Sequence, residues 1–266
     1  MSLIERLAGH TLCLHLAPQE LVYALRKGGR MGAAGRIAVD NPAGHWQAPL
    51  AALEQFLGRG DRPGAALPLR ISLASRWCPA ALAPWSEALL SEAGAARFLH
   101  AQMAALYGDA ARAWRIVGDD APYGQPRLVG AVDAALLQAL QDTAGAHGHA
   151  CHGVESLLTV AWRAIAAGKP PAFALVEPDR LTLAAVGAGR IVALQTQSCP
   201  ADWRAELARA WQRWSLRAPE LAGLAGVAVV DLSGAPQGEL AAPFRPAAAA
   251  LTRHGPVHLM RQSAWA

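Results

Sequence analysis

The 266 residues combine 53% apolar with 17% charged side chains, a balance that is typical of a folded globular protein and excludes a largely disordered chain. The net charge of +4 comes from scattered arginines rather than a basic block, so we do not expect nucleic-acid binding. No run approaches the ~20 apolar residues of a membrane helix. Residues 1–6 lack the features of a signal peptide, and we therefore expect a cytoplasmic protein.

Near the N-terminus, leucines alternate with other residues over 12–16, which predicts a strand with one leucine face. A second strand is predicted over 21–26, after the turn Ala17-Pro18-Gln19-Glu20. A third strand is predicted over 36–40. Residues 49–57 carry leucines at helical spacing. The predicted order is β-β-β-α.

The middle of the chain alternates between predicted strands and helices. Pro79 and Pro84 place the extended piece at 77–85 at a sheet edge. Asp133 is a predicted helix cap. The other predicted elements of this part are a strand at 69–73, a helix at 91–107, strands at 114–117 and 128–132, a helix after Asp133, an extended segment at 147–154 and a helix at 157–165.

The last part of the chain repeats the order of the first. Strands are predicted at 173–176, 181–186 and 190–195, followed by a helix at 200–214. A later strand is expected at 227–232 and a closing strand at 256–265. The repeated β-β-β-α order predicts an α/β protein with a duplicated, two-lobed, actin-like (ribonuclease H-like) fold, shortened relative to its relatives. We place one lobe at 1–168, with an inserted subdomain around 69–132, and the other at 169–266.

One long stretch carries a resemblance to a known family. Residues 69–109, LRISLASRWCPAALAPWSEALLSEAGAARFLHAQMAALYGD, resemble the actin-like cytoplasmic components of bacterial type IV pilus and type II secretion machines, the PilM and GspL-like proteins. LVGAVDAA at 128–135 and ALVEPDRLTLAAVGAG at 174–189 support the resemblance. It implies a scaffold at the inner membrane that recruits the cytoplasmic segment of a membrane partner and a second copy of itself. Some members bind ATP.

The two hairpin turns argue against a retained nucleotide. In actin-like ATPases such turns wrap phosphates with backbone N–H donors and small or hydroxyl side chains. Here each turn contains a proline, Pro18 or Pro178, which removes one donor. We therefore predict a pseudo-ATPase scaffold without a cofactor. In the alternative, an active ATP-binding protein or kinase, the residues that contact ATP and Mg²⁺ are Gln19, Glu177, Asp179 and Asp231.

Other catalytic chemistry has weak support in the sequence. His147, His149 and Cys151 alternate on one face of a predicted strand and form a candidate metal set, although a histidine-rich edge strand is the simpler interpretation. We predict no metal. The motifs G-x-S-x-G, G-x-x-x-x-G-K-[ST] and H-E-x-x-H do not occur, so a hydrolase of those classes is not predicted. The cysteines are far apart, without a C-x-x-C pair.

Tryptophan is the unusual residue of this chain, with nine copies against four phenylalanines and three tyrosines. Trp203, Leu207 and Trp214 fall on one face of a single predicted helix. One interpretation is core packing. The other is a partner-binding face, since tryptophan and arginine dominate interface hot spots and Arg204, Arg213 and Arg217 belong to the same helix. A partner is expected to bind as an extended segment in a cleft or at a sheet edge.

Overall fold

The computed structural model describes residues 10–59, 66–218, 221, 223–224, 226–236, 238–247 and 255–260. Contacts group these residues into two compact units. Unit 1 contains residues 10–78, 133–164 and 255–260, and unit 2 contains 79–132 and 165–247. The two units are described separately.

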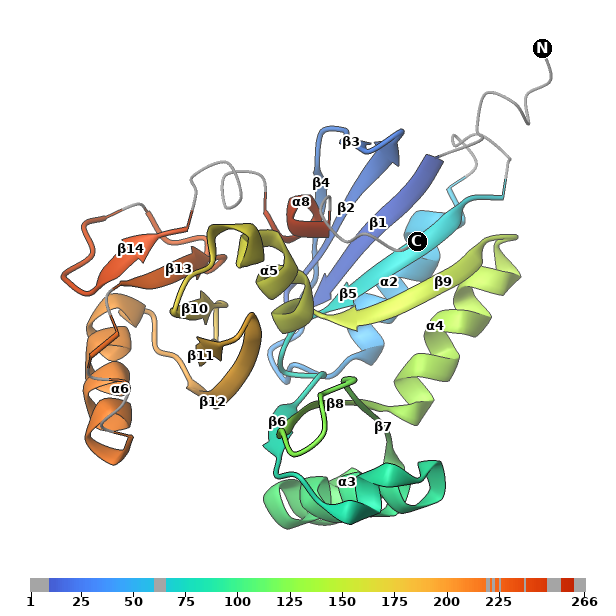
Figure 1. The fold of residues 1–266 in the computed structure, drawn as a ribbon. Helices are drawn as coiled ribbons and strands as arrows, with labels where there is room; N and C mark the ends of the chain where they lie inside the picture. The colour runs from blue at the N-terminus through green and yellow to red at the C-terminus, as the bar shows by residue number, and fades with distance from the viewer. Residues whose placement is uncertain are drawn as a thin grey trace. The chain divides into compact units, whose positions relative to one another are not determined.

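Unit 1 is built on one mixed sheet (Figure 1). Its strand order is β3-β2-β1-β5-β9, and β4 also pairs with β2. β1 is antiparallel to β2 and parallel to β5, which is parallel to β9. The strands are β1 His10–Ala17, β2 Glu20–Lys27, β3 Arg30–Met31, β4 Gly35–Ala38, β5 Pro68–Leu73 and β9 Ala150–Ser156. The helices are α2 Gln47–Leu57, α4 Ala134–Ala146, α5 Leu157–Ile165 and α8 Pro256–Leu259.

Alternation along β1 explains how this sheet is packed. Leu14 pairs with Tyr23 of β2, and the Tyr23 ring lies 4.2 Å from the ring of Phe56 on α2. Phe56 and Leu53 are both fully buried, so α2 packs on the leucine face of β1 as its helical spacing predicts. At the start of α4, the Asp133 carboxylate accepts a hydrogen bond from Ala135 N at 2.8 Å. This confirms the predicted cap.

Unit 2 contains a second sheet with the same topology. Its order is β12-β11-β10-β13-β14, in which the first three strands are antiparallel and β13 is parallel to β10. Read as third, second, first, fourth and fifth strand, this is the order found in unit 1. The predicted duplicated plan is thus confirmed. The elements are β10 Ala172–Val176, β11 Arg180–Gly187, β12 Arg190–Ser198, β13 Val227–Asp231, β14 Phe244–Pro246 and the helix α6 Trp203–Arg217.

A small third sheet, also in unit 2, has the order β6-β8-β7. The helix α3 packs against it and buries Leu99 and Met103 together with Val129. β6 is an edge strand, as its flanking prolines predict. The elements are β6 Ala80–Ala83, α3 Glu92–Tyr107, β7 Trp114–Gly118, β8 Arg127–Asp133 and the short 3₁₀ turns Glu87–Leu90, Gly108–Ala113 and Ala166–Gly168, of which the last follows α5.

The structure differs from the sequence predictions in two respects. The closing strand predicted at 256–265 is wrong for residues 256–259, which form the helix α8. Pro256 lies in the first turn of α8, where a backbone N–H would have no acceptor within the helix, so proline is tolerated there. Residues 261–265 lie outside the described residues. The sequence analysis placed an inserted subdomain around 69–132 in the first lobe, whereas the contacts group 79–132 with unit 2 and leave 69–78 in unit 1. Within the described ranges, no helix is long and apolar enough to cross a membrane.

Candidate functional site

The β1–β2 turn in unit 1 is the first candidate position. Its two residues, Pro18 and Gln19, use their carbonyl oxygens within the protein. Gln19 O accepts from Val39 N at 2.8 Å, and Pro18 O accepts from Asn41 Nδ2 at 3.1 Å. Asn41 is buried and also bonds His45, whose carbonyl oxygen is 2.6 Å from Asn41 Nδ2 and whose N–H donates to Oδ1 at 3.2 Å. The turn is therefore tied to the loop that precedes α2.

This turn has little to offer a phosphate group. Pro18 has no N–H, and the turn contains neither glycine nor serine or threonine. The Gln19 side chain is exposed. The Asn41-Pro42 pair is a turn signal in the sequence, but the contact of Asn41 with Pro18 was not predicted.

The β10–β11 turn in unit 2 is the second candidate position. Glu177 N donates to Arg180 O at 2.8 Å, and Asp179 O accepts from Cys199 N at 2.9 Å. The Glu177 side chain is buried, with 4% of its surface exposed. Asp231 ends the neighbouring strand β13 and pairs in register with Val176, the residue before Glu177. Three of the four predicted nucleotide contacts thus lie in unit 2, while Gln19 belongs to unit 1.

Negative charge gathers around Cys199 beside this turn. Burial, followed by the negative charges of Glu206, Asp179 and Asp231, raises the pKa of the Cys199 thiol to about 11. The Asp231 carboxylate organises its own loop by accepting from Ser233 N at 3.0 Å and from Ser233 Oγ at 2.6 Å. An anion placed here meets carboxylates and a thiol that stays protonated, an arrangement that disfavours phosphate.

The histidine-rich segment does not assemble into a cluster. His149 Nδ1 accepts from Leu67 N at 3.2 Å, which ties the segment to the start of β5. His147 caps the end of α4, and Cys151 pairs with Leu69 across the sheet. Across the described ranges, no three His, Cys, Asp or Glu side chains are close enough together to hold a metal ion.

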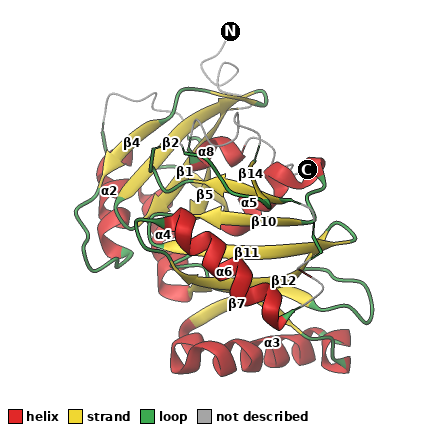
Figure 2. Ribbon diagram, turned by 90° about the vertical axis from the view of Figure 1, so that its left-hand side faces the viewer, coloured by secondary structure: helices red, strands yellow, loops and turns green. Residues whose placement is uncertain are grey.

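The tryptophan face of α6 belongs to the core. Trp203, Leu207 and Trp214 are exposed by 2%, 0% and 7%, and they pack on strands of the second sheet. Figure 2 shows α6 lying along β11 and β12. The prediction that these three residues anchor a partner is therefore wrong, because their apolar surface is already buried against Leu181, Leu183 and Phe244.

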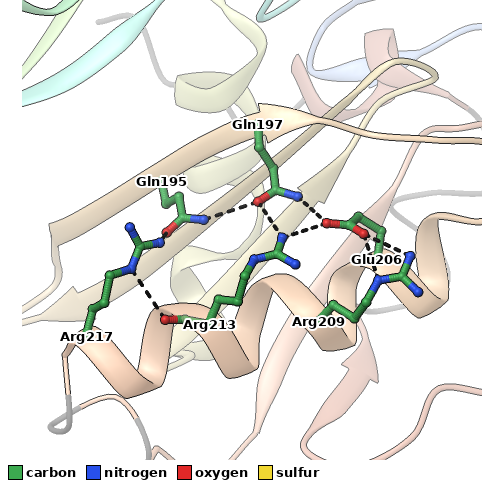
Figure 3. Close-up of polar contacts among 6 residues, drawn as sticks. All are labelled: Gln195, Gln197, Glu206, Arg209, Arg213 and Arg217. Atoms are coloured by element: carbon green, nitrogen blue, oxygen red, sulfur yellow. Dashed lines mark hydrogen bonds and ion pairs between the residues drawn. The ribbon is translucent and has the colours of Figure 1, made fainter.

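A polar network joins one flank of α6 to the neighbouring strand β12 (Figure 3). Arg213 Nη2 donates to the Glu206 carboxylate at 2.7 Å and to Gln197 Oε1 at 3.3 Å. Arg209 donates to the same carboxylate at 2.9 Å. Hydrogen bonds from Arg213 and then Arg209 lower the pKa of Glu206 to about 2. Of the arginines named in the sequence analysis, Arg213 and Arg217 are exposed and Arg204 is half-buried, whereas Trp203 and Trp214 are buried.

The fold was compared with solved structures. The cytoplasmic domain of EpsL, an inner-membrane component of the type II secretion system of Vibrio cholerae, superposes with a TM-score of 0.58 at 16% identity, covering 96% of this chain and 94% of that one. A Bacteroides thetaiotaomicron protein described as having an actin-like ATPase fold gives a TM-score of 0.59 at 12% identity, with 88% and 87% covered.

This chain has the actin-like fold. The PilM–PilN type IV pilus biogenesis complex matches as well, with a TM-score of 0.52 at 13% identity over 79% of this chain and 68% of that one. At these identities the likeness establishes the fold, and the fold predicted from the sequence is confirmed. No family model matches the chain, and no curated protein matches it.

Proposed function

We propose that this protein is a cytoplasmic actin-like scaffold of a pilus or type II secretion assembly, which binds partner proteins at the inner membrane and does not depend on nucleotide. The observation that carries the proposal is the near-complete superposition on the EpsL cytoplasmic domain, over 96% and 94% of the two chains. The match to the PilM–PilN type IV pilus biogenesis complex supports a role in binding a partner protein.

The two hairpin turns support the pseudo-ATPase part of the proposal. An actin-like ATPase needs backbone donors and a metal-bound phosphate at both turns. In unit 1 the turn lacks the Pro18 donor, and its carbonyl oxygens accept bonds from Val39 and Asn41. In unit 2, Glu177 is buried and Asp179 and Asp231 lie around a protonated Cys199. These residues do not fit the phosphates of ATP.

Calorimetric titration with ATP and Mg²⁺ tests the nucleotide part. We expect no saturable heat at millimolar ATP and no rise in the melting temperature. A ligand present at 100 times its Kd would stabilise the native state by about 2.7 kcal/mol, which a thermal shift detects. Saturable, Mg²⁺-dependent binding would overturn this part, and its loss in Glu177→Gln would assign it to the β10–β11 turn.

A binding assay tests the scaffold part. Purified protein is mixed with immobilised cytoplasmic tails of inner-membrane pilus and secretion proteins, and scrambled versions of the same tails serve as controls. We expect one tail to retain the protein saturably. Light scattering on the same sample measures whether a second copy takes part. Failure of every tail would contradict the scaffold role, whatever the calorimetry gives.

A further inference from the structure

The flank of α6 beside β12 presents partly exposed arginines at regular intervals. Arg209, Arg213 and Arg217 follow one another every four residues, so they lie along one stripe of the helix. Leu216 lies two turns after Arg209 and therefore shares that stripe. Together with Gln195 and Gln197 of the neighbouring strand β12, these four residues are called the arginine face. Figure 3 shows its arginines and glutamines.

Contacts hold the arginine side chains in place. Arg217 Nη2 donates to Gln195 Oε1 at 3.0 Å, and Gln197 Nε2 donates to Glu206 Oε1 at 2.6 Å. Arg213 lies between Gln197 and Glu206. A planar guanidinium that is already oriented loses less conformational entropy when it binds a carboxylate. The arginine face is therefore prearranged for an oxygen-rich ligand.

The charges on this face do not balance. Glu206 is the carboxylate that both Arg209 and Arg213 contact, and Arg217 bonds an amide and the carbonyl of Arg213 instead. Like charges four residues apart in a helix destabilise it, and exposed ion pairs return little stability. Stability of the helix thus does not account for three arginines in series. Carboxylates from another molecule would relieve the repulsion.

The arginine face is also accessible. The Arg209 and Arg213 side chains are 57% and 49% exposed, and Leu216 is 77% exposed. Since the inner face of α6 buries three tryptophans, the stripe points away from the core. An exposed leucine among arginines matches the composition of protein interfaces, where an apolar anchor is surrounded by polar contacts.

We propose that the arginine face docks an acidic segment of a partner protein, with its carboxylates on Arg209, Arg213 and Arg217 and an apolar side chain on Leu216. The proposal rests on the proposed scaffold function, for which it names a surface and the chemistry of the partner. A protein segment fits better than a phosphate backbone, because a phosphate backbone would leave Leu216 without an apolar contact.

Fluorescence anisotropy with a labelled synthetic peptide rich in Glu and Leu tests the surface. We expect saturable binding to the wild-type protein. Affinity should fall about tenfold for Arg213→Gln, the scale of one charge-assisted hydrogen bond. Leu216→Ser should weaken binding while leaving its salt dependence unchanged. Circular dichroism melts confirm that each variant is folded.

The matched control is Arg112→Gln, which removes an exposed arginine of the same unit that pairs with Asp109 three residues earlier. This variant should bind the peptide as the wild type does. Equal loss in Arg112→Gln and Arg213→Gln, or equal binding by Arg213→Gln and the wild type, would overturn the proposal. Stronger binding to single-stranded DNA or to phosphatidylglycerol vesicles than to the peptide would overturn it too.

The tail-binding assay separates this proposal from the scaffold function. If a tail binds the wild type and Arg213→Gln equally, the scaffold stands and the arginine face is wrong. If no tail binds but peptide binding still requires Arg213, the arginine face is supported as a docking surface and the proposed role in a pilus or secretion assembly is wrong.

Discussion

His15 Nδ1 lies 3.0 Å from Ser72 Oγ, and the two residues occupy paired positions on the parallel strands β1 and β5. Both are buried, with 3% and 0% of their surfaces exposed. Burial lowers the pKa of His15 to about 3, with a smaller contribution from the charge of Arg36, while a hydrogen bond with the Ser72 backbone acts in the opposite direction. The central sheet of unit 1 thus contains a neutral imidazole.

This pair predicts a pH dependence of folding stability. The His15 pKa is about 3 in the folded chain and 6.5 in an unfolded chain, so between these pH values the unfolded chain binds more protons than the folded one. The contribution of neutral His15 is complete above pH 6.5 and decreases as the pH falls toward 3. The slope is at most about 1.4 kcal/mol per pH unit. Urea titrations at several pH values give the free energy of unfolding as a function of pH, which should change less steeply for His15→Phe than for the wild type. An equal pH dependence in the two proteins would contradict the assignment.

Ser72 is predicted to stabilise the same sheet. Ser72→Ala removes the hydroxyl that bonds His15 Nδ1 and leaves this buried nitrogen without that bond, which should lower the free energy of unfolding by about 1–3 kcal/mol. Urea denaturation measures the loss. Ser198→Ala, at an exposed position of β12, should change the free energy of unfolding by less than about 0.5 kcal/mol. A Ser72 variant as stable as this control would mean that the bond contributes nothing net.

The two sides of α6 should respond differently to truncation. Trp214 is 7% exposed and Leu216 is 77% exposed. Trp214→Ala should lower the free energy of unfolding by about 3–5 kcal/mol, because it opens a cavity in the core. Leu216→Ala should change it by no more than about 0.5 kcal/mol. Chemical denaturation of both variants distinguishes the core side from the solvent side, and similar losses would contradict the orientation of the helix.

Glu206 predicts a second, more acidic pH effect. Hydrogen bonds from Arg213 and Arg209 lower its pKa from 4.5 to about 2. A carboxylate with a lowered folded pKa contributes stability above pH 4.5, and this contribution is lost as the pH falls toward 2. Thermal melts over this range should fall less steeply for Glu206→Gln than for the wild type. If the two curves stay parallel, the carboxylate is not held as the contacts indicate.

Asn41 should control the conformation of the β1–β2 turn. Asn41→Ala removes its bonds to Pro18 O, His45 O and His45 N, so we expect a loss of about 1–3 kcal/mol. Hydrogen exchange at the Val39 and His45 amides should speed up, because both donate to this turn and loop. Unchanged exchange at both amides would show that the loop is held by other contacts.

The order of elements could be predicted from the sequence because it depends on local periodicity. The alternating leucines of β1, the proline-flanked edge strand β6 and the Asp133 cap each act within a few residues, and the structure contains all three. The closing segment failed for the same local reason. Residues 256–260 are mostly apolar, and a short, mostly apolar run does not distinguish a strand from one helical turn.

The sequence by itself determined the duplicated β-β-β-α order and the loss of one backbone N–H donor to a proline in each hairpin turn, since neither depends on distant contacts. Only the tertiary structure decided which side of α6 is buried and which charges meet. Tryptophan and arginine both favour interfaces, and the packing of Trp214 on the second sheet leaves Arg213 outside. The acidic surroundings of Cys199 likewise combine residues from three separate segments, which come together only when β10, β13 and α6 are folded side by side.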